Sequence, residues 1–150
     1  MVVTGIYTAN VESRRLIPLY SSQASCGFPS PAGDYAEEDL DLNEHLIQNS
    51  AATFYVRAVG DSMVSAGIFS GDLLVIDKSL APTNKDVVIV ALDGQFMVKR
   101  FSDDGETRRL FSENGERREV KIDEESDVRI WGVVTHTIHS FRSRNGHRPV

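Results

Sequence analysis

The sequence predicts a mostly β fold, a compact and partly open β-barrel or bent sheet that follows a flexible N-terminal arm. From residue 53 onward the chain consists of short runs rich in Val, Ile and Phe, and residues of these types are enriched in strands. Glycine, asparagine and aspartate separate the runs. No run alternates with a long helical pattern, which argues against a parallel α/β sheet.

The composition is that of one ordinary globular domain. The chain has 150 residues, of which 41% are hydrophobic and 25% charged, enough for one core. Its formal net charge of −6 does not favour strong direct binding to nucleic acid phosphates. The single cysteine, Cys26, leaves no partner for an internal disulfide and fits a reducing compartment. Residues 1–15 lack the apolar core of a signal peptide, and no run reaches the roughly 18 apolar residues of a membrane helix. We therefore expect a cytoplasmic protein.

The first third of the chain carries weaker patterns. Residues 1–26 show no sustained period of 2 or 3.6, so we expect an arm that docks through a few apolar side chains. Residues 26–33 are dense in glycine and proline, which predicts an extended or turned segment with few internal hydrogen bonds. Such a segment is typical of a linker, and it also suits a protease groove.

Residues 37–47 predict a short helix. Asp41 or Asn43 would be its N-cap, because a short polar side chain can accept hydrogen bonds from the first amides of a helix. Its apolar face would be formed by Leu42, Leu46 and Ile47.

Six strands are predicted after this helix. They span residues 53–59, 73–77, 87–92, 96–101, 109–112 and 128–136. Asp93-Gly94 lies between two of them and is a hairpin signal, since glycine accepts the positive φ of such turns. The stretches 103–105 and 113–115 repeat this signal.

Ser62 and Lys99 are the candidates for chemistry. Ser62 follows Gly60 and Asp61 directly after the strand predicted at 53–59, and Lys99 lies in the strand predicted at 96–101. A serine is a poor nucleophile until a base takes its proton, and a lysine can be that base if burial lowers its pKa. Strand alternation places Met97 and Phe101 on either side of Lys99. Our hypothesis is that Ser62 is a nucleophile, Lys99 its general base, and the chain's own arm the substrate.

Each candidate also fits a plain structural role. A lysine can extend from a strand edge into water, and a serine after Gly-Asp commonly caps a turn. None of the four histidines lies in a motif that would seat a Ser-His-Asp triad; they are His45, His136, His139 and His147. Since His136 and His139 are three apart in a predicted strand, they point to opposite faces. With only one cysteine in the chain, no zinc site is expected.

Several sequence blocks resemble the serine–lysine peptidase core that LexA repressors and UmuD proteins share. These blocks are Gly60-Asp61-Ser62-Met63, residues 71–77, Asp93-Gly94 and Val98-Lys99-Arg100. Three further blocks resemble UmuD specifically, namely residues 26–32, Asp41-Leu42-Asn43 and Gly132-Val133-Val134. They occur in the family's order from about Pro18 to about His139. The chain thus resembles UmuD-type precursors, which cleave themselves in the SOS response to DNA damage.

The resemblance implies a role for each matched residue. Ser62 would attack the carbonyl of Cys26, and Lys99 would take the serine proton and pass it to the amide nitrogen of Gly27. Backbone N–H groups of Asp61, Ser62 and Met63 would stabilise the oxyanion. No cofactor and no metal are implied.

The implied domain division follows the cleavage site. Residues 1–26 would be a removable arm and 27–52 a linker with a short helix. Residues 53–141 would form the serine–lysine peptidase-like β domain, and 142–150 a basic tail with Arg142, Arg144 and Arg148. The segment 103–127 and the tail 140–150 match no family motif, and we expect both to be solvated surface.

The resemblance also implies partners. A RecA filament on single-stranded DNA would act as co-protease, and homodimers would join a UmuC-like Y-family polymerase subunit in translesion synthesis. Cleavage within one chain or between dimer partners, a chromosomal or mobile-element origin, and the identity of the polymerase partner stay open.

Three alternatives compete with this interpretation. A LexA-like repressor needs a DNA-binding domain, and the 26 residues before Gly27 are neither basic nor helical enough for one. A type I signal peptidase needs a membrane anchor, and no apolar run in this sequence is long enough to form one. A non-enzymatic polymerase accessory or dimerisation subunit with a vestigial dyad is the alternative that stays open.

Overall fold

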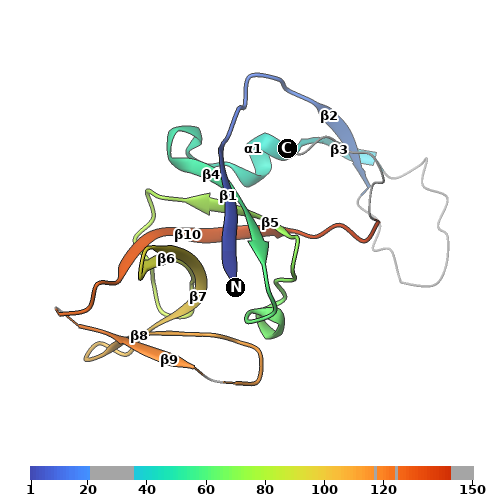
Figure 1. Cartoon of the computed structure of the whole chain (residues 1–150). Helices are drawn as coiled ribbons and strands as arrows, with labels where there is room; N and C mark the ends of the chain where they lie inside the picture. The colour runs from blue at the N-terminus through green and yellow to red at the C-terminus, as the bar shows by residue number, and fades with distance from the viewer. Residues whose placement is uncertain (21–35, 117, 124, 143–150) are drawn as a thin grey trace.

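A barrel of antiparallel strands forms the centre of the molecule. The structure is a computed structural model that describes residues 1–20, 36–116, 118–123 and 125–142. Eight strands form one sheet in the order β1-β4-β5-β10-β6-β7-β8-β9, and β1 also pairs with β7, which closes six strands into a barrel (Figure 1). The barrel strands are β1 (Val2–Thr8), β4 (Thr53–Val59), β5 (Leu73–Asp77), β6 (Val87–Leu92), β7 (Gln95–Asp103) and β10 (Arg129–Ile138).

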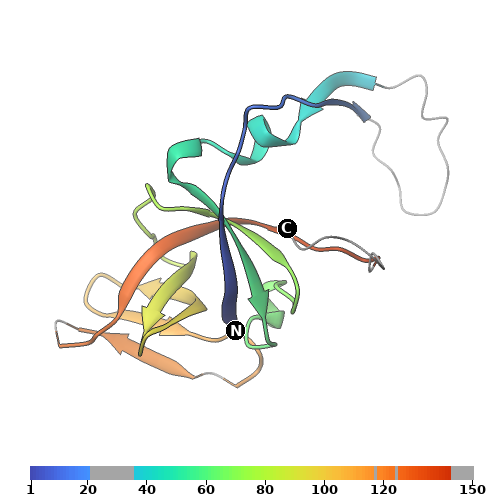
Figure 2. The same cartoon turned by 45° about the horizontal axis from the view of Figure 1, so that its top comes forward.

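The remaining elements extend or flank the barrel. β8 (Arg108–Phe111) and β9 (Glu119–Ile122) form a hairpin that continues the sheet from β7, and β2 (Leu16–Tyr20) pairs with β3 (Ala36–Asp41) in a separate ribbon that projects from the barrel (Figure 2). The short helices are α1 (Leu42–Leu46), η2 (Ser50–Ala52) and η3 (Val64–Ala66). Among the described residues, no helix is long and apolar enough to span a membrane.

The predicted fold class and the six predicted strands are confirmed. The runs at 53–59, 73–77 and 87–92 coincide with β4, β5 and β6, and the other three match β7, β8 and β10 within two residues at each end. Disagreement of this size is normal at strand ends. Short runs rich in Val, Ile and Phe, separated by glycine, asparagine and aspartate, were therefore sufficient to place the central strands.

Four strands were not predicted from the sequence, and one of them changes the description of the barrel. β1, β2, β3 and β9 all lie where the sequence shows no sustained alternation. β1 contains Gly5 and a register shift between Val3 and Gly5, so its pattern is broken. Its pairing partners β4 and β7 are far away in sequence. With β1 in place the barrel is closed, not partly open as predicted.

Apolar side chains are buried on both faces of the sheet. Along β6, Ile89 belongs to one buried cluster, whereas its neighbours Val88 and Val90 belong to the other. Cluster 1 consists of Val56, Ala58, Met63, Ile68, Leu74, Ile76, Ile89 and Val98. Cluster 2 consists of Val88, Val90, Phe101, Leu110 and Val133, with Val120 and Ile122 of the β8–β9 region packed against it. β6 is thus buried on both faces, which explains its nearly continuous apolar run.

Gly132 is required by close packing between β10 and β5. A Cβ atom at this position would lie 2.6 Å from Cγ2 of Ile76, whose side chain is fully buried. A shift in register between Ile130 and Gly132 accompanies this approach. The glycine of the block Gly132-Val133-Val134 therefore has a local steric reason.

Helix α1 is capped as predicted, but it is shorter than predicted. The Asp41 carboxylate accepts hydrogen bonds from the amides of Asn43 and Glu44 at 2.9 and 3.4 Å, so Asp41 is the N-cap. The residues before it form β3. Leu42 is 54% exposed, so the predicted common apolar face is wrong at this residue. A helix of five residues is too short to bury a continuous stripe.

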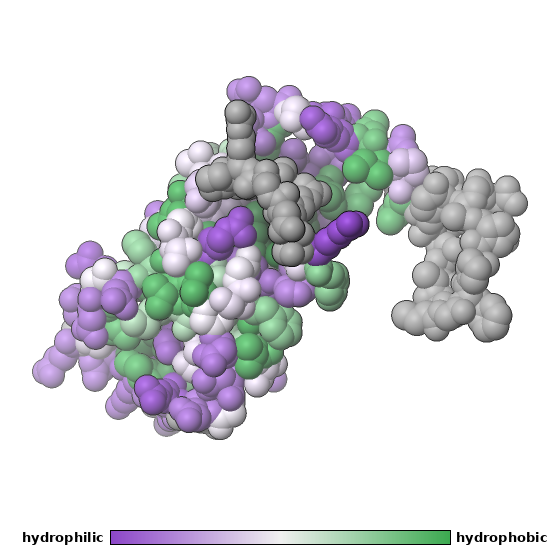
Figure 3. Space-filling model, turned by 45° about the vertical axis from the view of Figure 1, so that its right-hand side comes forward, coloured by the Kyte–Doolittle hydropathy of each residue, from purple (hydrophilic) through white to green (hydrophobic). Residues whose placement is uncertain are grey.

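The β2–β3 ribbon carries apolar side chains that the barrel does not cover. Leu16, Ile17 and Leu19 of β2 are all exposed. Figure 3 shows hydrophobic residues at this ribbon, and hydrophobic and hydrophilic residues interspersed over the barrel.

The segment 103–127, predicted to be solvated surface, is partly structural. It contains β8 and β9, and Leu110 of β8 is fully buried in cluster 2. The many charged residues of this hairpin face outward, where Arg109 lies within 3.5 Å of Asp104 and 3.4 Å of Glu119. Charged composition concealed the few apolar residues that attach the hairpin to the barrel.

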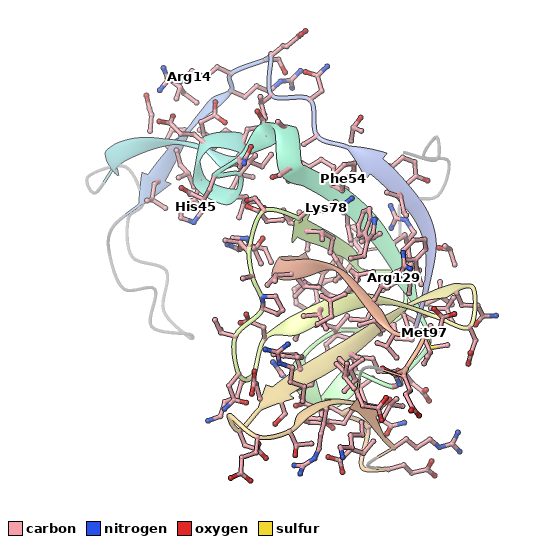
Figure 4. The ribbon with its side chains drawn as sticks, turned by 90° about the vertical axis from the view of Figure 1, so that its left-hand side faces the viewer. Arg14, His45, Phe54, Lys78, Met97 and Arg129 are labelled. Carbon is pink, nitrogen blue, oxygen red and sulfur yellow. The ribbon has the colours of Figure 1, made fainter. Side chains whose placement is uncertain are left out.

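Three aromatic side chains from different strands meet beneath Lys78. Trp131 of β10 lies 5.2 Å from Phe54 and 5.6 Å from Phe96 between ring centroids. The Lys78 ammonium is 4.6 Å from the Trp131 ring and 5.5 Å from that of Phe54, beside which Figure 4 shows it. These distances fit cation–π contacts. Because Trp131 is the chain's only tryptophan, its fluorescence reports on β4, β7 and β10 together.

Candidate active site

Ser62 lies in a tight turn directly after β4. Gly60 begins the turn with φ +111°, a conformation that side-chain-bearing residues rarely adopt. Met63 follows and is completely buried in cluster 1. The turn is thus anchored from inside by its methionine, while Ser62 lines the adjoining cleft.

Lys99 lies in β7 with its ammonium group in the same cleft. Its Nζ donates a hydrogen bond to Oγ of Ser112 at 2.7 Å, and Ser112 itself is only 6% exposed. Met97 and Phe101, its neighbours on this face, pack in cluster 2, as predicted. Burial lowers the pKa of Lys99 below its ordinary value, and the nearby guanidinium of Arg118 lowers it further. Both causes disfavour the charged amine.

One cleft of about 330 Å³ brings the two candidates together. The residues that line it come from the turn after β4, from β7 and from the β8–β9 connection; they include Asp61, Ser62, Lys99, Ser112, Asn114 and Arg118. Residue Met1 also lines it, and its amino group donates a hydrogen bond to Oγ of Ser62. The serine hydroxyl is therefore already engaged by Met1, the residue directly before β1.

A two-residue segment after β8 touches both candidates. Ser112 accepts from Lys99, and the backbone N–H of Glu113 donates to the carbonyl of Ser62 at 2.7 Å. The Glu113 carboxylate forms a two-point ion pair with Arg100, at 2.8 and 3.0 Å. This pair raises the pKa of Arg100 and lowers that of Glu113. Segment 112–113 therefore sets the position of the serine turn relative to β7.

This segment was missed in the sequence because it lies inside the charged stretch 103–127. Its only signal in the sequence was the turn Glu113-Asn114-Gly115, which predicted a hairpin but no contact with Ser62 or Lys99. Arg118, two residues beyond Glu116 in the same connection, reaches the cleft as well. Side chains in a charged loop can therefore line a cleft although no alternation of polar and apolar residues in the sequence identifies them.

The predicted oxyanion donors lie in the turn that holds Ser62. Within the described part of the chain, the N–H groups of Asp61, Ser62 and Met63 donate no hydrogen bond to another residue. Free amides are what an oxyanion site requires. The assignment itself stays a prediction, as do Cys26 and Gly27, which lie outside the described residues together with Arg144, Arg148 and His147.

The histidines have other neighbours. His139 pairs through Nδ1 with Asp72, which is buried and also accepts hydrogen bonds from the Phe69 amide and the Thr137 hydroxyl. His136 contacts the hydroxyl of Thr135. No group of three or more His, Cys, Asp or Glu side chains in the described ranges is arranged to hold a metal ion.

A serine and a lysine whose pKa is lowered by burial thus line the same cleft of the β-barrel. In comparison with known proteins, the Peptidase S24-like family model matches residues 18–135. Similar proteins include ImpA of Salmonella typhimurium, 44% identical over 83% of this chain and 85% of its own length. SamA of Salmonella typhimurium is 46% identical over 84% of this chain and 87% of its own. MucA of Escherichia coli is 37% identical over 81% and 84%.

The chain therefore belongs to the Peptidase S24-like family. Its similarity to ImpA, SamA and MucA confirms the resemblance to the LexA/UmuD-like proteins.

Proposed function

We propose that this protein is a UmuD-like mutagenesis precursor that cuts its own chain between Cys26 and Gly27. The observation that carries the proposal is the shared cleft, in which Ser62 lies with a lysine whose pKa is lowered by burial. A neutral amine at Lys99 can accept a proton, whereas the ordinary ammonium cannot.

The proposed reaction has two steps. In the first, Oγ of Ser62 bonds to the carbonyl carbon of Cys26 while its proton passes to Lys99 Nζ. The bond from this carbon to the amide nitrogen of Gly27 then breaks, and Lys99 returns the proton to the leaving nitrogen.

The second step frees the serine. Water attacks the ester carbon while Lys99 takes a proton from it. The bond from this carbon to Oγ of Ser62 then breaks, and Lys99 returns the proton to the serine oxygen. The products are residues 1–26, now ending in a carboxylate, and a chain that begins at Gly27. The free amides of the turn at residues 61–63 would stabilise the negative charge that develops on the carbonyl oxygen.

The biological setting of the proposal rests on family membership. We infer that a RecA filament on single-stranded DNA stimulates the cleavage in the cytoplasm during the SOS response. The shortened chain then serves as a homodimer with a UmuC-like polymerase subunit. The formal net charge of −6 favours contact with protein partners over contact with DNA itself.

The test is the intact mass of the purified chain after incubation at about pH 10, where a larger fraction of lysine is neutral. A parallel sample is kept at neutral pH with a RecA–DNA filament. The parent should lose residues 1–26, whereas Ser62→Ala and Lys99→Ala should keep their full mass. Lys121→Ala, which removes an exposed strand lysine, is the matched control and should be cut like the parent. A parent of unchanged mass under both conditions would favour the non-enzymatic accessory subunit.

A further inference from the structure

The slot between β4 and β7 is filled by the chain's own first strand. β1 pairs with β4 from Val2↔Val59 to Thr8↔Phe54, and on its other side Val2 is paired with Met97 of β7. The N–H of Val98 donates to the carbonyl of Met1 at 3.1 Å. Figure 4 shows Met97 beside the start of β1. β1 is therefore bound by backbone pairing to the two strands that lead to Ser62 and carry Lys99.

The start of β1 lies where a substrate must react. Met1 lines the cleft, and its amino group is hydrogen bonded to Oγ of Ser62. Its Cα would lie 3.4 Å from a Cβ placed on Gly60, at the beginning of the serine turn. A peptide carbonyl attacked by Ser62 has to approach the same oxygen, so it cannot be there while Met1 is.

The contacts of β1 are those of a strand that can be displaced. Val2, Ile6 and Tyr7 are 41, 40 and 37% exposed. In β1 only Val3 packs against cluster 1, together with the preceding Met1. The register shift between Val3 and Gly5 interrupts the pairing further. Few buried apolar contacts and an interrupted ladder are features of segments that open locally.

We propose that β1 is an autoinhibitory strand, which occupies the substrate slot between β4 and β7 and must leave before the segment around Cys26–Gly27 can reach Ser62. This inference rests on the proposed self-cleavage. An incoming extended segment would take over the backbone edges that β1 releases, as peptides do when they add to an open sheet edge. The cleavage rate then scales with the fraction of molecules in which β1 has left the slot.

The first test loosens β1 without touching the dyad. Val3→Asp places a charge where Val3 packs against cluster 1, and it should speed self-cleavage about tenfold because burying an unpaired carboxylate opposes docking. Thr4→Asp is the matched control, since Thr4 is exposed at the register shift and the same charge costs little there. Equal rates for both variants and the parent would overturn the inference.

The second test locks β1 in place. Val2 and Val59 are direct cross-strand partners and both are exposed, so Val2→Cys with Val59→Cys can form a disulfide under oxidation. The oxidised chain should resist cleavage at about pH 10, and a reductant should restore it. The control pair Arg109→Cys with Lys121→Cys links β8 to β9 at another register pair.

The outcomes separate this inference from the proposed function. Cleavage of the locked chain at the rate of the control pair would overturn the role of β1 and leave self-cleavage intact. A chain that stays uncut in every form, reduced or oxidised, would refute self-cleavage and this inference with it.

Discussion

Ser62 lies in the turn after β4 and Lys99 lies in β7, but the same short segment contacts both. Ser112 holds the amine of Lys99, and its neighbour Glu113 holds the backbone of Ser62. The local chemistry of the site thus depends on side chains that do not themselves react. Two predictions distinguish residues that position the lysine from residues that set its pKa.

Ser112→Ala should lower the rate of self-cleavage at every pH, including the plateau reached at high pH. The variant removes the hydrogen bond at 2.7 Å that orients Lys99 Nζ, and loss of one such bond corresponds to about tenfold in rate. The measurement is a pH–rate profile by intact mass. Ser126→Ala, in the loop before β10, is the control; an unchanged plateau in Ser112→Ala would exclude the positioning role.

Arg118→Gln should instead move the profile to higher pH and leave its plateau unchanged. The Arg118 cation helps to lower the pKa of Lys99, so removing it raises that pKa and a higher pH is needed to deprotonate the amine. Because Arg118 is largely exposed, the shift should be small and should shrink further with salt. Arg108→Gln, which lies outside the cleft, should match the parent. A shift to lower pH would contradict the assignment.

At the scale of the elements, an ion pair connects two neighbouring parts of the sheet. The Arg100–Glu113 ion pair connects β7 to the segment after β8, and both side chains are less than one quarter exposed. Arg100 also donates to the carbonyl of Lys85 at 2.7 Å. The pair therefore ties the strand that carries Lys99 to the segment that holds the serine turn.

Glu113→Gln should cost about 1–2 kcal/mol of folding free energy at pH 7, because it weakens a two-point charged hydrogen bond. Arg100 lowers the pKa of Glu113, so this contribution is complete above the ordinary carboxyl pKa of about 4.3. It is lost as the pH falls through the lowered pKa of the folded state. Urea unfolding at pH 7 and at about pH 3 measures this. Glu116→Gln, from an exposed pair with Arg118, should change stability by less than about 0.5 kcal/mol; a loss for Glu113→Gln that persists in acid would contradict the ion-pair account.

At the scale of the whole molecule, two buried clusters share the same strands. β6 contributes to both clusters through alternate residues, and so does β7, with Val98 in one and Phe101 in the other. Because neither cluster can be exposed without separating these strands, we expect the barrel and the β8–β9 hairpin to unfold together.

Met63→Ala and Leu110→Ala test this cooperativity, one in each cluster. Both side chains are fully buried, so each truncation should cost about 2–5 kcal/mol. Urea unfolding followed by Trp131 fluorescence and by far-UV circular dichroism should give coincident curves with an unchanged slope. Two separated transitions, with Leu110→Ala moving only one, would show that the hairpin unfolds independently.

The sequence by itself determined the central strands, the fold class and the two candidate residues. Short runs of β-branched and aromatic residues are a local signal, and so are the glycines of the turns at residues 60 and 94. The N-cap of α1 was also predicted from a local signal, which left Asp41 and Asn43 as the two candidates. The resemblance to the family added the proposed roles of Ser62 and Lys99, because each residue lies in a short block that matches a family motif.

Only the tertiary structure decided that the barrel is closed and what lies against Ser62. β1 has a broken pattern, and its partner strands β4 and β7 begin only at Thr53 and Gln95, far along the chain from its last residue, Thr8. The contacts of Ser112, Glu113 and Arg118 likewise arise only when the β8–β9 hairpin folds back onto β7. Local propensity contains no information on such long-range pairing, whose stability comes from burial and hydrogen bonds between distant segments.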